Sequence, residues 1–174
     1  MTDASSLAVR VFADGADIAS IRKLADDPLI SGFTTNPTLM RKAGIEDYEQ
    51  FATELVEVVP DRPISFEVFS DDFAEMERQA LKIASWGDNV YVKIPITNTE
   101  GTSSLDLVRR LTDQSVKLNV TALMTNEQVD ASAAALEAIR ADPQRFDAMI
   151  TDERMPGMTG SALIRQVRGI RDGI

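Results

Sequence analysis

Polar side chains that can do covalent or acid/base chemistry stand one to three at a time in or directly after five short apolar segments. They are Asp14, Thr34, Thr35, Asn36, Glu67, Lys93, Asn119 and Thr121. Lys93 lies in VYVKIPI, where strand alternation puts Val92 and Ile94 on the opposite face. An amine that loses hydration there is more readily neutral, and a neutral amine attacks carbonyl carbons to form a Schiff base. Glu67 and Asp14 would then relay protons in the carbinolamine and enamine steps.

Each of these residues has a plainer interpretation when it is taken alone. A single strand lysine usually keeps its charged end in water, and Glu67 alone is typical of a solvent-facing strand position. Asn36 followed by Pro37 alone indicates a turn. The catalytic interpretation depends on joint placement, because strand ends converge on one face in folds built of alternating strands and helices.

The composition restricts the chemistry further. The 174 residues include no cysteine and no histidine, which excludes thiolates, disulfides and histidine-based triads. The net charge of −10 would be repelled by phosphate backbones, so we expect no nucleic-acid partner. No apolar run approaches membrane-spanning length, and the start MTDASS lacks the features of a signal peptide. We therefore expect a soluble, cytoplasmic chain without membrane association.

Short apolar runs rich in β-branched residues alternate with segments of helical periodicity. The predicted strands are 7–13, 29–34, 64–69, 89–96, 116–123 and 146–151. The predicted helices are 17–26, 46–58, 72–85, 103–113, 127–141 and 159–169. These six βα units predict a single α/β domain over 1–174 with parallel strands and helical crossovers. The pattern alone does not separate a barrel from an open doubly wound sheet.

Several motifs over roughly residues 8–129 occur together in one order. They are FADGAD, GFTTNPTLM, ISFEVF, NVYVKIPITNTEG and KLNVTAL. Together they resemble the transaldolase family, including its small fructose-6-phosphate aldolase-like members. The resemblance implies a (β/α)8 barrel, a sugar-phosphate ligand such as fructose 6-phosphate, and no metal or other cofactor. We expect at least the first five strands to follow barrel order, 1-2-3-4-5, since only that order brings their polar residues together.

The resemblance also implies a role for each of these polar residues. Lys93, in the V-K-I-P motif, is the Schiff-base lysine, and Asp14 is a proton-transfer residue. Glu67 positions the catalytic water. The residues implied to bind substrate are Thr35, Asn36, Asn119 and Thr121.

Past about Glu127 the transaldolase pattern is expected to fail, and residues from about 133 to 171 resemble the middle of a response-regulator receiver domain. The matching segment is AALEAIRADPQRFDAMITDERMPGMTGSALIRQVRGIR. It places Asp152 at the phosphoacceptor position and Met155-Pro156 in the following turn. Phosphorylation needs Mg²⁺ held by an acidic pair that the first strand lacks, so Asp152 is expected to be vestigial.

The leading hypothesis is therefore a recombined or engineered hybrid. In it, a transaldolase-like partial barrel over 1–129 is completed by a flavodoxin-like receiver fragment over 130–174. Folding would be its main property, with residual Schiff-base reactivity at Lys93. The alternatives are a working class I aldolase or transaldolase acting on sugar phosphates, and a phosphoaspartate receiver. Two missing barrel strands would expose sheet edges, so we expect a homo-oligomer, with a dimer the simplest form.

Overall fold

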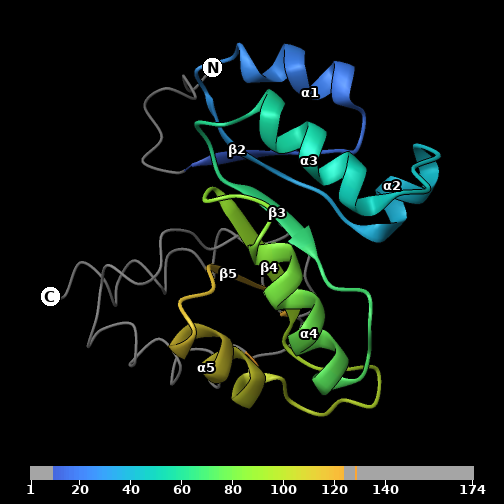
Figure 1. Cartoon of the computed structure of the whole chain (residues 1–174), viewed down its shortest axis with the longest axis vertical. Helices are drawn as coiled ribbons and strands as arrows, with labels where there is room; N and C mark the ends of the chain where they lie inside the picture. The colour runs from blue at the N-terminus through green and yellow to red at the C-terminus, as the bar shows by residue number, and fades with distance from the viewer. Residues whose placement is uncertain (1–9, 124–127, 129–174) are drawn as a thin grey trace, which may run out of the picture.

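The computed structural model describes residues 10–123 and residue 128, and strands alternate with helices along them (Figure 1). The strands are β1 (Val11–Asp14), β2 (Ile30–Thr34), β3 (Ile64–Glu67), β4 (Val90–Pro95) and β5 (Leu118–Thr121). The helices are α1 (Ile18–Ala25), α2 (Pro37–Lys42), α3 (Tyr48–Val58), α4 (Phe73–Ala84) and α5 (Leu105–Asp113).

The five strands form one parallel sheet in the order β1-β2-β3-β4-β5, which confirms the predicted barrel order. In Figure 1, α1 and α3 run along the part of the sheet nearest β1 and β2, and α4 and α5 lie beside β4 and β5. A receiver-like sheet would instead place the first strand inside the sheet. The described fold is a curled half-barrel. The predicted strand 146–151 and the flavodoxin-like completion lie outside the described residues.

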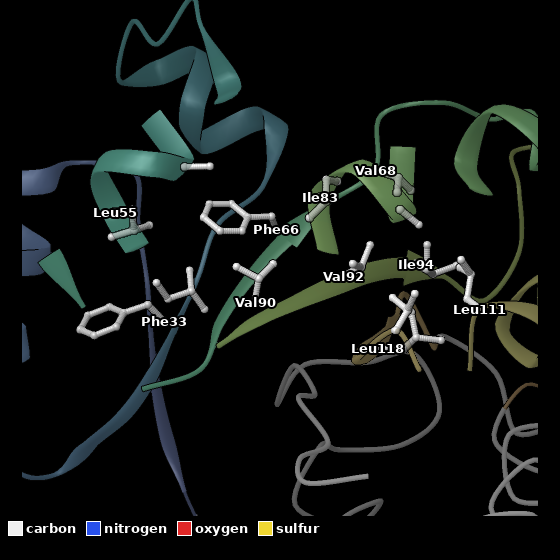
Figure 2. Packing of buried hydrophobic residues seen from close by; sticks show 14 of the residues in the cluster. Phe33, Leu55, Phe66, Val68, Ile83, Val90, Val92, Ile94, Leu111 and Leu118 are labelled. Atoms are coloured by element: carbon white, nitrogen blue, oxygen red, sulfur yellow. The ribbon is translucent and has the colours of Figure 1, made fainter. Parts of the chain in front are cut away.

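Strand alternation gives the sheet two chemically different faces. In β4, Val90, Val92 and Ile94 are buried, whereas the intervening Tyr91 and Lys93 are half-buried. Figure 2 shows the apolar face of β3 and β4 packed beneath helical side chains. The labelled residues are Phe33, Leu55, Phe66, Val68, Ile83, Val90, Val92, Ile94, Leu111 and Leu118. Burial of this face against the helices leaves the polar side chains on the concave face.

Aspartates fix where three of the helices begin. The carboxylates of Asp17, Asp47 and Asp72 each accept a hydrogen bond, of 2.8–2.9 Å, from the backbone N–H three residues later. Each bond satisfies a donor that the first helical turn leaves unpaired. The starts of α1, α3 and α4 are therefore set locally by sequence, close to the predicted positions.

Helix α2 was not predicted, because Asn36 and Pro37 alone indicate a turn. In the structure the Asn36 side chain accepts a hydrogen bond from Leu39 N–H at 2.9 Å and caps the helix. Pro37 occupies the first turn, where its missing N–H removes no helical bond. The same two residues that suggested a turn therefore start a short helix.

Strands β2 to β5 are shorter than the apolar runs predicted for them. The last of the five ends at Thr121 rather than at residue 123, because Ala122 has a positive φ of 62°. Ser115, also at φ 62°, precedes that strand. A left-handed backbone is incompatible with continued strand geometry, so Ala122 ends β5 at Thr121. No helix in residues 10–123 is long and apolar enough to cross a membrane.

We predict that Gly32→Ala destabilises the fold through the packing between β1, β2 and β3. Gly32 is paired with Phe12, and a Cβ there would lie 2.7 Å from the Pro63 carbonyl oxygen. Because backbone must move to relieve this overlap, we expect a loss of about 1–3 kcal/mol in the free energy of unfolding. Urea unfolding measures it, with Gly15→Ala as control, since no atom lies within 4 Å of a Cβ at Gly15. Equal midpoints for the two variants would contradict this packing.

Candidate active site

The strand register brings three predicted site residues into one row on the concave face. Glu67 on β3 is paired with Lys93 on β4, and Lys93 is paired in turn with Asn119 on β5. Parallel strands place the carboxyl ends of all three at the same edge. The structure therefore groups an amine, a carboxylate and an amide, as the motif spacing predicted.

Lys93 lies between two oxygen atoms. Its Nζ is 3.3 Å from Glu67 Oε2 and donates a hydrogen bond of 3.2 Å to the Thr35 carbonyl oxygen. The Lys93 and Glu67 side chains are only 12% and 23% exposed. The amine is therefore largely shielded from water and lies within reach of a carboxylate and a backbone carbonyl. Glu67 is also placed to take the proton that the amine must lose before it attacks a carbonyl carbon.

Asn119 and Thr121 occupy the β5 side of the row. The Asn119 side chain is buried, and its Nδ2 donates a hydrogen bond of 3.2 Å to Ser65 Oγ. Thr121 is half-buried and is paired in register with Pro95. Ser65 was not predicted, although it stands two residues before Glu67 in ISFE and must therefore share its face.

Asp14 lies at the end of β1, on the other side of β2 and β3 from the lysine. Thr34 Oγ1 donates a hydrogen bond of 2.8 Å to Asp14 Oδ1, and the two residues are paired in register. Asp14 is exposed, whereas Thr34 is buried. Thr34 thus orients a carboxylate on the concave face, which also carries Lys93.

Thr35 and Asn36 stand where β2 turns into α2. Thr35 is fully buried, and its Oγ1 has no hydrogen-bond partner among the described residues. An unpaired buried hydroxyl is uncommon, and here it is adjacent to the carbonyl that contacts Lys93. The side-chain amide oxygen of Asn36 caps α2. The sequence had not indicated this structural role.

A hydrogen-bonded turn adds to the rim above β4. Thr97 and Ser103 form an antiparallel bridge, and Asp71, in the segment after β3, accepts a hydrogen bond of 2.8 Å from Thr99 N–H. The hydrogen bonds from Thr99 lower the pKa of Asp71. The segments that follow β3 and β4 are thereby joined beside the site. The described ranges contain no group of three acidic residues able to hold a metal ion.

A family model and curated relatives agree on one family. The model for Transaldolase/Fructose-6-phosphate aldolase matches residues 11–151. A "Probable transaldolase" of Dehalococcoides mccartyi is 39% identical over 127 residues, which are 73% of this chain and 57% of that protein. A "Probable transaldolase" of Streptococcus agalactiae serotype V is 35% identical over 164 residues, which are 94% of this chain and 71% of that protein. The chain thus spans little more than half the length of the first relative.

Two solved structures share the fold at low sequence identity. A protein described as a phosphonomutase from Burkholderia cenocepacia has a TM-score of 0.60 at 14% identity, over 92% of this chain and 74% of that one. A monomeric dihydrodipicolinate synthase variant has a TM-score of 0.56 at 13% identity, over 92% of this chain and 60% of that one. At such identities the likeness shows the fold alone.

The family similarity continues beyond the point where the sequence motifs were expected to end. The model match reaches residue 151, and the streptococcal match covers nearly the whole chain, so both cross the boundary placed at residue 129. These matches show neither a receiver segment nor a hybrid origin. Asp152 and the rest of the predicted receiver fragment lie outside the described residues. The chain belongs to the transaldolase/fructose-6-phosphate aldolase family.

Proposed function

We propose that this chain carries the Schiff-base half of a class I aldolase or transaldolase that acts on a sugar phosphate. The observation that carries the proposal is the environment of Lys93, whose amine lies between the Glu67 carboxylate and the Thr35 carbonyl at the end of a parallel strand. The family match and the curated relatives support the same chemistry. The substrate class rests on the family and on the name of the relatives.

The reaction would begin when Lys93 gives up a proton and its nitrogen attacks the substrate carbonyl carbon. Loss of the carbonyl oxygen as water from the carbinolamine leaves a protonated imine. Removal of a proton from the substrate hydroxyl then breaks the neighbouring C–C bond. Its electron pair passes to the imine, which yields an enamine on the lysine and a free aldehyde. We assign the first proton acceptance to Glu67 and the later hydroxyl deprotonation to Asp14.

The working-enzyme interpretation is preferred to the hybrid in which folding is the main property. The family match extends through residue 151, beyond the expected join. A receiver role for Asp152 has no support among the described residues or these comparisons. Association of two chains stays a prediction, and β1 and β5 are the outer strands of the described sheet that a second copy would cover.

We predict that borohydride traps dihydroxyacetone or fructose 6-phosphate covalently on Lys93. The peptide containing Lys93 should gain the mass of the reduced adduct, and Lys93→Met should abolish that gain. Lys117→Met is the matched control. Lys117 just precedes β5 and donates to the Asp88 carbonyl, at the amino ends of the strands and away from their carboxyl ends. It should leave the adduct unchanged. An adduct that survives in Lys93→Met would contradict the assignment.

We predict that Asp14→Asn separates adduct formation from C–C bond cleavage. The asparagine side chain has the same shape as aspartate and keeps an oxygen for the hydrogen bond from Thr34 Oγ1. Its amide cannot take a proton from a substrate hydroxyl. Trapping on Lys93 should persist, while the cleavage rate falls by about 10²–10⁴-fold, the usual contribution of a general base. Single-turnover release of aldehyde measures the cleavage step. Equal cleavage rates in both proteins would remove Asp14 from the mechanism.

A further inference from the structure

One hydroxyl group makes two hydrogen bonds to the backbone of Glu67. Tyr48, the first residue of α3, donates from its hydroxyl to the Glu67 carbonyl at 3.0 Å. The same oxygen accepts a hydrogen bond of 2.9 Å from Glu67 N–H. Tyr48 thus forms both hydrogen bonds with the main chain of the residue whose side chain lies beside the site lysine.

These bonds replace sheet bonds that β2 does not provide. Ile64 and Val68 donate to carbonyls on the β4 side. The Ser65 carbonyl instead accepts from Thr35 N–H, on the β2 side. Glu67 stands two residues after Ser65 in the same strand, so its backbone N–H and C=O also point toward β2. But β2 ends at Thr34 and the chain turns into α2. Tyr48 supplies both missing partners.

The replacement leaves the Thr35 carbonyl available to Lys93. In a longer β2, that carbonyl would be the acceptor for Glu67 N–H. With Glu67 N–H bonded to Tyr48, the Thr35 carbonyl instead accepts from Lys93 Nζ at 3.2 Å. The hydroxyl of Tyr48 therefore influences both oxygens that contact the amine.

The Tyr48 ring is itself held in place. It makes edge-to-face contacts with Phe66, Phe69 and Trp86, at centroid distances of 5.9, 4.8 and 5.1 Å. Burial raises the pKa of Tyr48, so its hydroxyl stays protonated and able to donate. A phenylalanine would keep these ring contacts and lose only the hydroxyl.

We propose that Tyr48 is a positioning residue, which sets the end of β3 so that the Glu67 carboxylate and the Thr35 carbonyl both meet Lys93. Its consequence for catalysis rests on the proposed Schiff-base function. Its consequence for the lysine's surroundings does not, and it is measurable without any substrate.

The test compares the wild type with Tyr48→Phe, Glu67→Gln and the double variant. Acetic anhydride labels lysines in competition, and mass spectrometry gives the pH profile of Lys93 acetylation, with exposed Lys23 on α1 as internal reference. Glu67→Gln removes the carboxylate that lies 3.3 Å from the amine, so we expect roughly fivefold faster labelling at neutral pH. Tyr48→Phe should produce part of that increase. The double variant should exceed Glu67→Gln by less than the effect of Tyr48→Phe alone, because the part that acts through the Glu67 carboxylate is already lost.

Ile83→Val controls for a general loss of stability. Ile83 is a buried residue of α4 without a role in the site, and its truncation should lower stability while leaving the Lys93 profile unchanged. An unchanged profile in Tyr48→Phe, effects that add fully in the double variant, or no effect of Glu67→Gln would each overturn the inference. Borohydride trapping on the same proteins separates the two proposals. Absence of a wild-type adduct, with the labelling pattern as expected, would reject the proposed function and leave the positioning role standing.

Discussion

The register between β3 and β4 is the constraint on which the candidate site depends. It pairs Glu67 with Lys93, and a slip of one residue would turn Lys93 toward the helices. That register is held from the other face, where Phe66 and Val92 are fully buried beneath the helices. Hydrophobic packing on one side of the sheet therefore fixes electrostatic contacts on the other, which links the core of Figure 2 to the chemistry of the concave face.

A second constraint is the early end of β2. Because the chain leaves the sheet for α2, the backbone at the end of β3 lacks its strand partner, and Thr35 keeps a carbonyl that accepts from Lys93. Asn36 and Pro37 cause this exit, since one caps the helix and the other suits its first turn. The T-T-N-P motif thus shapes the lysine site through the backbone as well as through any direct contact with substrate.

The sequence predicted the strand order, because only that order brings the polar residues of the five strands together. The grouping of Glu67, Lys93 and Asn119 follows from that order and from side-chain alternation along each strand. It missed α2, since a short segment beginning with Asn-Pro has the local signature of a turn. It missed Tyr48, because its hydroxyl bonds to a backbone 19 residues away, a tertiary contact with no periodicity to reveal it. It also placed the end of the family similarity too early, since motif recognition is weaker than similarity spread over 164 aligned residues.

A crystal structure of the protein after borohydride reduction with dihydroxyacetone tests the central claim most directly, since it shows the covalent bond and its surroundings together. The account predicts continuous density from Lys93 Nζ to the central carbon of the three-carbon unit. The Glu67 carboxylate should face that carbon, and its backbone should remain bonded to the Tyr48 hydroxyl. Density on a different lysine, or Glu67 turned away from a modified Lys93, would contradict the account.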